Sequence, residues 1–311
     1  MYRHLFLLIV LLFSNSQLFA VNIPAAPYDA LKYHANFNAN NLNAVDYNFN
    51  AIVKLSNCSG SIIQFNGQPD TAKAIVLTNG HCIQNTGGFL KPGEIVFNRL
   101  GNRSMKVANK VKKFFDISAT KLLYATMTGT DIALYELKET FNDLKKFQIV
   151  PLQLDNNHPS IKEDIEIISG FWERGYACSI DAFIPKLKEA DWSWNDSIRY
   201  SAVGCETKGG TSGSPIISKS QGTVIGVNNT GNESGQRCTL NNPCEVDGNG
   251  QISVRLKASY GQQTFQVYSC LTPDFKIDLS ISNCALHKGP TSNGSKPRNM
   301  WGKKSLDLAK K

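Results

Sequence analysis

Residues 208–215 read KGGTSGSP, in which Ser212 stands among glycines and small residues and Pro215 follows closely. Glycine, serine and proline gather in turns for backbone reasons alone, so the stretch by itself predicts an ordinary surface turn. The same residues also suit a serine nucleophile held on a tight turn. The choice depends on whether the rest of the chain supplies a base and an acid for Ser212, because a serine hydroxyl is almost wholly protonated at neutral pH.

Short β-type runs fill the chain from residue 51 onward, and each is rich in Val, Ile, Tyr and Phe with Gly, Asn or Pro between them. Only 138–147 and part of 185–195 have the composition of short helices. The pattern predicts an all-β architecture, a barrel or a sandwich, in one contiguous body of two barrels over 51–285. The expected strands are 51–55, 61–65, 74–78, 94–100, 121–127, 131–137, 148–154, 164–171, 198–204, 214–218, 223–227, 251–256 and 264–268.

The two ends of the chain have compositions of their own. Residues 1–20 combine a basic start, a short apolar run and a small residue at a plausible cleavage point, which predicts a secretory signal peptide and export. Residues 21–50 are rich in asparagine and are expected to be an arm or pro-segment. Residues 286–311 carry seven basic residues against one acid, so most of the formal net charge of +8 lies in this tail. The tail is expected to be disordered, either solvated or weakly bound to anionic surfaces, and no nucleic-acid partner is expected.

The eight cysteines are an even number in a chain expected to be exported, which indicates up to four disulfides. A zinc site requires closely spaced pairs with histidines nearby, and only one pair is close in sequence. No metal and no cofactor are therefore expected. The cysteines are Cys58, Cys82, Cys178, Cys205, Cys238, Cys244, Cys270 and Cys284.

A histidine is the natural base for a serine, because its unperturbed pKa is about 6.5. His81 ends a buried-looking strand in AIVLTNGHC, and a cysteine that can anchor the turn follows it. Asp131 precedes an alternating, strand-like run and is the candidate acid, with Asp116 as its rival. Taken singly, His81 is also consistent with a structural histidine and Asp131 with a turn former.

The segments LTNGHC, TDIAL and GGTSGSP, in this order, resemble the chymotrypsin/trypsin-like serine protease family, and in particular its bacterial secreted branch, whose nucleophile motif tends to end in Ser-Gly-Ser-Pro. The resemblance covers 51 to about 270 and implies two six-stranded antiparallel β-barrels, split near 140–160, with the active site in the cleft between them. It implies that Ser212 attacks, His81 moves the proton and Asp131 orients the histidine. The implied reaction is peptide-bond hydrolysis through an acyl-enzyme by a monomeric secreted endopeptidase.

Further roles follow from the same resemblance. The backbone N–H groups of Gly210 and Ser212 would form the oxyanion hole, and a Cys58–Cys82 disulfide would hold the strand that carries the histidine. Glu206 would lie near the floor of the substrate pocket, where an acid favours Lys or Arg, although a solvent-facing Glu206 is an equal alternative. Apart from the resemblance, a Cys178–Cys205 disulfide would brace the region before the nucleophile, and Cys238–Cys244 and Cys270–Cys284 are expected from proximity in the sequence alone.

Several features depart from the family or from rival classes. Thr211 stands where trypsin-like zymogens have an aspartate, so activation by a new N-terminal amine is not expected. Asn228 stands where glutamate-specific relatives have a pocket histidine, which argues against that specificity. The chain lacks Gly-x-Ser-x-Gly and βαβ alternation, which excludes an α/β-hydrolase. The remaining alternative is a catalytically silent protein of the same fold that binds a partner.

Overall fold

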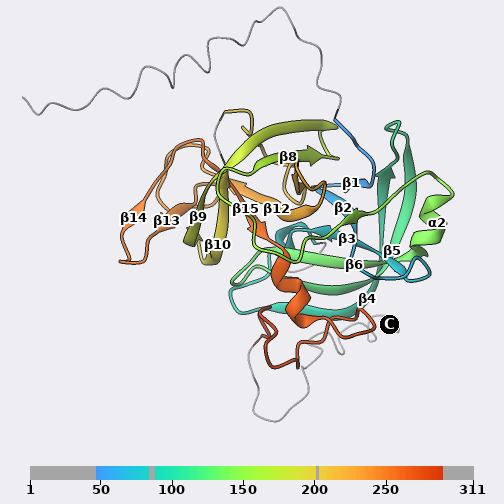
Figure 1. Ribbon diagram of the computed structural model, residues 1–311. Coiled ribbons are helices and arrows are strands. Elements are labelled where there is room, and N and C mark those ends of the chain that lie inside the picture. Colours follow the sequence, from blue (N-terminus) through green and yellow to red (C-terminus); the bar gives the residue numbers. More distant parts are fainter. Residues whose placement is uncertain (1–46, 84–87, 201–202, 290–311) are drawn as a thin grey trace, which may run out of the picture. The chain divides into compact units, whose positions relative to one another are not determined.

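The computed structural model describes residues 47–83, 88–200 and 203–289, and over these residues the chain is nearly all β (Figure 1). Its strands form one seven-stranded and one eight-stranded sheet. The chain leaves the first sheet after Gln153 and enters the second at Asp164. The first seven strands of the sequence therefore form one sheet, and the next eight strands form the other.

Six strands of the first sheet close into an antiparallel barrel. The pairing order is β1–β4–β5–β6–β3–β2, and β1 also pairs with β2, which completes the ring. The last strand, β7, is added to β2 in the parallel direction. The strands are β1 (Ile52–Lys54), β2 (Ser59–Gln64), β3 (Lys73–Thr78), β4 (Ile95–Ala108), β5 (Phe114–Thr126), β6 (Ile132–Thr140) and β7 (Leu152–Gln153).

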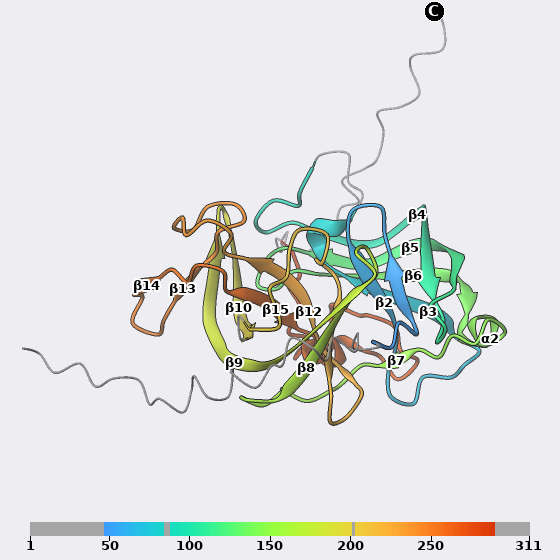
Figure 2. The same ribbon diagram turned by 90° about the horizontal axis from the view of Figure 1, so that it is seen from above.

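The second sheet repeats this plan with six antiparallel strands. The order β10–β15–β12–β11–β8–β9 is closed by a pairing of β9 with β10, and the hairpin β13–β14 is added to β9 (Figure 2). The two six-stranded antiparallel barrels expected from the sequence are therefore present. The strands are β8 (Asp164–Ser169), β9 (Arg174–Glu189), β10 (Trp192–Tyr200), β11 (Pro215–Ser218), β12 (Val224–Gly231), β13 (Cys244–Val246), β14 (Ile252–Ser253) and β15 (Ser259–Gln263).

Two neighbouring strands of the first barrel, β2 and β3, are almost wholly buried. Every residue of β2 is buried, as are the last five residues of β3, AIVLT. Fully burying a Val, Leu or Ile side chain contributes about 1.5–3 kcal/mol, which fixes β3 inside the first barrel. The position of β3 matters because its end carries the histidine of interest.

Helices are short in the described residues: η1 (Gly80–Cys82), α2 (Phe141–Lys145) and η2 (Phe265–Cys270). The expected helix within 138–147 is α2, which begins with a capping box: the Thr140 hydroxyl accepts from the Asp143 N–H, and the Asp143 carboxylate accepts from the Thr140 N–H.

Two expectations about elements are wrong. Part of 185–195 has the composition of a short helix, but it forms the end of β9 and the start of β10. Leu187 and Glu189 alternate there with exposed residues and are buried. Residues 264–268 were expected to be a strand but begin η2, because the chain turns there after β15. The run 148–154 contributes only Leu152–Gln153, since Pro151 has no N–H to donate to a neighbouring strand.

Four disulfides link the described cysteines, in the pairings expected from the sequence. They are Cys58–Cys82, Cys178–Cys205, Cys238–Cys244 and Cys270–Cys284. The expected signal peptide at 1–20, most of the arm at 21–50 and most of the tail at 286–311 lie outside the described residues. In the described part of the chain, no helix has the length and apolar character needed to cross a membrane.

Candidate active site

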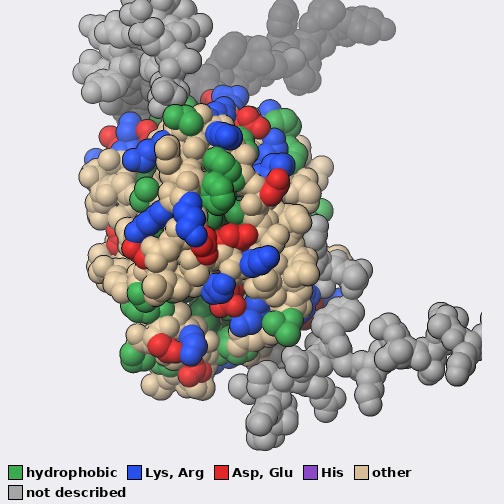
Figure 3. Space-filling model, turned by 90° about the vertical axis from the view of Figure 1, so that its right-hand side faces the viewer, with side chains coloured by type: hydrophobic (Ala, Val, Ile, Leu, Met, Phe, Trp, Pro, Cys, Tyr) green, Lys and Arg blue, Asp and Glu red, His purple; other side chains and the backbone are tan. Residues whose placement is uncertain are grey.

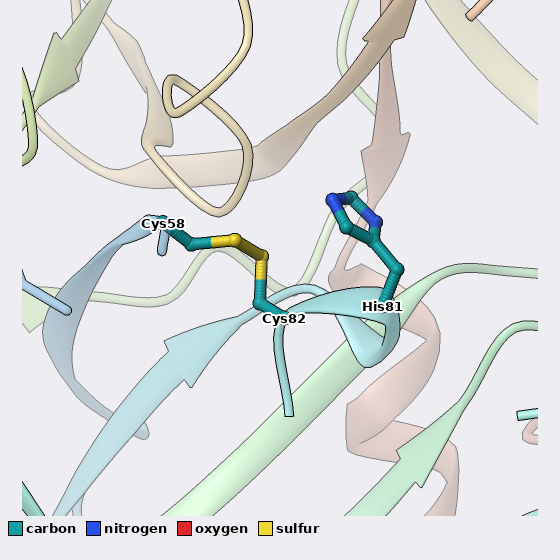
Figure 4. A group of neighbouring side chains, drawn as sticks. All are labelled: Cys58, His81 and Cys82. Atoms are coloured by element: carbon teal, nitrogen blue, oxygen red, sulfur yellow. A yellow bond between two sulfur atoms is a disulfide. The ribbon is translucent and has the colours of Figure 1, made fainter. Parts of the chain in front are cut away.

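His81 lies in the tight turn η1, directly after β3. A side chain at Gly80 would put its Cβ 2.0 Å from the Thr126 carbonyl oxygen, so only glycine permits this close approach of the turn to the neighbouring strand. Cys82, next in the chain, is bonded to Cys58 (Figure 4). The residues before and after His81 are therefore both fixed, Gly80 by its close approach to Thr126 and Cys82 by its disulfide.

Asp131 binds both the backbone and the ring of His81. Its Oδ2 lies 2.7 Å from His81 Nδ1, and its Oδ1 accepts the His81 N–H at 3.0 Å. Asp131 is fully buried, and its carbonyl oxygen accepts from the Asn79 side chain at 2.7 Å. In the neutral imidazole, the Nδ1–H that donates a hydrogen bond to the carboxylate leaves Nε2 without a proton. This is the tautomer that a general base needs.

Ser212 lies on a turn that is bound tightly to neighbouring backbone. Its carbonyl oxygen accepts the Ser59 N–H at 2.8 Å, and the next residue, Gly213, donates its N–H to the Asn228 carbonyl at 2.9 Å. Gly210 has a φ of +90°, a conformation that favours glycine. Among the described residues, neither the Gly210 nor the Ser212 backbone N–H has a hydrogen-bond acceptor.

Both barrels line one cavity of about 810 Å³, with His81 and Asp131 from the first and Ser212 from the second. The three residues singled out in the sequence are thus brought together. The Ser212 hydroxyl donates to the Asn229 carbonyl at 3.0 Å, and no hydrogen bond joins it to His81 within the described residues. Apo active sites commonly have such unaligned contacts, which tighten only when substrate binds.

The electrostatics of the cavity favour a positive charge on His81. Burial lowers the pKa of the imidazole, but the Asp131 carboxylate, by charge and by hydrogen bond, and the Glu189 carboxylate raise it, and the result is a pKa above the usual value. Burial also raises the pKa of Glu189, whose oxygens accept from the Thr230 hydroxyl at 2.6 Å and the Asn241 N–H at 2.9 Å.

Sequence reasoning missed Glu189. The residue is only 5% exposed and lines the same cavity as His81, yet it stands in a segment, KLKEADW, whose composition resembles an exposed helix. No signal in the sequence singles it out, because Glu189 follows another charged residue, Lys188, and only the pairing of β9 makes it face inward.

The two pocket candidates also line this cavity. Glu206 is exposed, while Asn228 is 2% exposed and its Oδ1 accepts the Tyr200 hydroxyl. Thr211 is fully buried, with its hydroxyl 3.5 Å from that of Tyr176. The neutral Thr211 side chain offers no charge to an amine at this position.

The rival acid, Asp116, is a surface residue. Its side chain on β5 is 84% exposed and pairs with Lys106 at 2.7 Å, so it lies away from His81 as a candidate partner.

The cysteines beside His81 are not free to bind a metal. The sulfur atoms of Cys58 and Cys82 lie within 4.8 Å of a ring nitrogen of His81, but the sulfurs are bonded to each other and are not thiolate ligands (Figure 4).

Many solved structures are similar to this chain, three of them at 13–14% sequence identity. One is the protease domain of MamO from Magnetospirillum magneticum in its apo form (13% identity, 72% of this chain and 97% of that one, TM-score 0.45). The others are Deg5 (14% identity, 62% and 82%, TM-score 0.40) and the Nocardiopsis protease NAPase (13% identity, 69% and 90%, TM-score 0.38). No curated protein matches the chain by sequence.

The family model of the trypsin-like peptidase domain matches residues 58–227, which is more than half of the 311-residue chain. The match includes the positions of His81, Asp131 and Ser212. The chain therefore belongs to the trypsin-like peptidase family.

Proposed function

We propose that this protein is a serine endopeptidase whose triad is His81, Asp131 and Ser212. The observation that carries the proposal is the 2.7 Å contact of a fully buried Asp131 with His81 Nδ1, in the cavity that Ser212 also lines. A buried carboxylate fixes the tautomer and orientation of an imidazole, which leaves the other ring nitrogen free to accept a proton from a nucleophile.

In the proposed reaction the Ser212 oxygen attacks the carbonyl carbon of the scissile peptide bond, and its proton passes to His81 Nε2. The resulting imidazolium is stabilised by Asp131. The C–N bond then breaks, His81 returns the proton to the departing amine, and an ester remains on Ser212. A water molecule, deprotonated by His81, attacks this ester, and the acid product leaves with the serine restored.

The developing oxyanion requires hydrogen-bond donors. The unpaired N–H groups of Gly210 and Ser212 support an oxyanion hole at this turn. Removal of one such donor typically costs about 10²–10³ in rate, so both are needed for an efficient enzyme. The hydroxyl of Ser212 must also turn from the Asn229 carbonyl toward His81, which we assign to substrate binding.

Secretion is part of the proposal. The apolar run near the start of the sequence and the four disulfides support an oxidising compartment outside the cytoplasm, in line with the bacterial secreted branch of the family. The substrates would be proteins or peptides, and the protein would act as a monomer.

Labelling with a fluorophosphonate serine probe tests the proposed catalysis. The wild-type protein is expected to be labelled, and Ser212→Ala is expected to take no label because the attacking oxygen is absent. Heat-denatured wild-type protein is the control, since activation of the serine depends on the folded site. Absence of label on folded wild-type protein would favour the alternative of a silent, partner-binding protein.

Specificity is a separate question, for which Glu206 is the candidate. The carboxylate of Glu206 lines the cavity and would favour Lys or Arg at the cleaved bond. Cleavage of a peptide library by wild-type protein and by Glu206→Gln measures this preference. We expect Lys and Arg to be preferred by the wild type and the preference to weaken in the variant. An unchanged cleavage pattern in the variant would remove Glu206 from the pocket.

A further inference from the structure

Trp172 lies in the loop that follows β8 and contacts the nucleophile turn from outside the cavity. Its indole Nε1 donates to the Gly209 carbonyl oxygen at 2.8 Å. The Lys208 ammonium lies 3.7 Å from the centre of the indole ring, and the Phe171 ring packs edge-on at 5.0 Å. An indole that is 42% exposed is thus held in one place by a cation and a second aromatic ring.

The bond to Gly209 fixes the orientation of the Gly209–Gly210 peptide. All peptide bonds described are trans, so the Gly210 N–H points opposite to the Gly209 carbonyl and away from the indole. The cavity is lined by Gly209 and Ser212 but by neither Trp172 nor Phe171. The Gly210 N–H is thus turned away from an indole that lies outside the cavity.

The following peptide is held in the same manner. The Gly210 carbonyl oxygen accepts from the Ser59 hydroxyl at 3.1 Å, and Ser59 is fully buried. A Cβ at position 210 would lie 2.7 Å from Phe171 Cδ1 and 3.0 Å from Trp172 Nε1. The indole thus lies directly against Gly210, and both peptides flanking Gly210 have their carbonyl oxygens bound.

We propose that Trp172 is a positioning residue for the oxyanion hole: its indole N–H holds the Gly209 carbonyl so that the Gly210 N–H is presented to the reacting carbonyl oxygen. The inference rests on the proposed function and goes beyond it, because Trp172 touches neither His81 nor Ser212. Without the bond, the peptide can rotate and present a carbonyl oxygen in place of a donor. That orientation repels a developing oxyanion, so the cost falls on the transition state.

Trp172→Phe tests the proposal because it keeps an aromatic ring beside Lys208 and removes the indole N–H, together with the part of the bicyclic ring that a phenyl group does not replace. We expect fluorophosphonate labelling to slow by about three- to tenfold, the factor that one such hydrogen bond typically contributes to an equilibrium. In peptide cleavage we expect kcat to fall by the same factor with KM unchanged, since substrate contacts in the ground state are retained.

Tyr268→Phe is the matched control, because it also removes one side-chain donor to a backbone carbonyl, that of Leu154, at a place that does not line the cavity. It should be labelled at the wild-type rate. Labelling of Trp172→Phe at the wild-type rate, or equal slowing in both variants, would overturn the inference. A wild-type protein that takes no label refutes the proposed function instead, so the two failures differ.

A measurement on the wild-type protein covers the case in which Trp172→Phe does not fold. A peptide boronic acid mimics the tetrahedral intermediate and should favour the anchored peptide orientation. We expect the Trp172 indole N–H to exchange with solvent more slowly, by NMR, when the boronic acid is bound. Exchange that is unchanged on binding contradicts the inference.

Discussion

At the scale of single residues, the site is built around the charge on His81. Asp131 contacts the imidazole directly and Glu189 adds a second negative charge across the same cavity, and together they outweigh the opposing effect of burial. A general base must be neutral to accept a proton, so stabilising the imidazolium moves the active form to higher pH. In the proposed mechanism, the same stabilisation of the imidazolium favours the transition state in which His81 carries the serine proton.

The rise of kcat/KM with pH should therefore have its midpoint above pH 6.5, the ordinary value for histidine. Glu189→Gln removes one negative charge near His81, which lowers its pKa and should move the midpoint to lower pH. A pH profile of peptide cleavage measures both midpoints. Asp116→Asn, a change at an exposed aspartate on β5, is the control and should leave the profile unchanged. A Glu189→Gln midpoint equal to that of the wild type would show that this carboxylate does not act on His81.

At the scale of elements, the start of β2 ties the two halves of the site together. The Ser59 N–H binds the Ser212 carbonyl, while the adjacent Cys58 is bonded to Cys82, next to His81. The nucleophile turn of the second barrel and the histidine turn of the first are thus attached to neighbouring residues where β2 begins. Loss of the disulfide should disturb the geometry of the site as well as the stability of the fold.

Replacement of Cys58 and Cys82 by alanine should lower the free energy of unfolding by about 3 kcal/mol. The disulfide links residues 24 apart in sequence, and this is the loss of chain entropy in the unfolded state expected for a loop of that size. The replacement should also lower kcat. The matched control replaces Cys270 and Cys284, which close a loop of 14 residues away from the cavity and should cost similar stability without changing kcat. Denaturant unfolding and cleavage kinetics measure both effects, and an equal loss of kcat in the two variants would contradict the special role of β2.

The elements also show why some features could be predicted from the sequence and others could not. β3 and β11 contain unbroken runs of β-branched and aliphatic residues, AIVLT and PIIS, and His81 and Ser212 stand beside them in short motifs. β15 reads SYGQQ, without a β-branched residue, and is a strand only because β10 and β12 pair with it. Trp172 belongs to no motif, because its role depends on the loop after β8 meeting the turn at Gly209.

At the scale of the whole molecule, each barrel supplies a different part of the proposed site. The first barrel holds the His81–Asp131 pair, and the second holds Ser212 and the turn that contains Gly210. On the face shown in Figure 3, basic and acidic side chains are interspersed and not gathered into a patch of one sign.

The central claim is that Ser212 is the nucleophile, and the most direct measurement is to locate the fluorophosphonate adduct by mass spectrometry. After labelling of the folded protein and proteolysis, we expect one adduct per molecule, on the oxygen of Ser212 in the peptide that contains KGGTSGSP. An adduct on another serine, or an unmodified Ser212 in folded protein, would contradict the account.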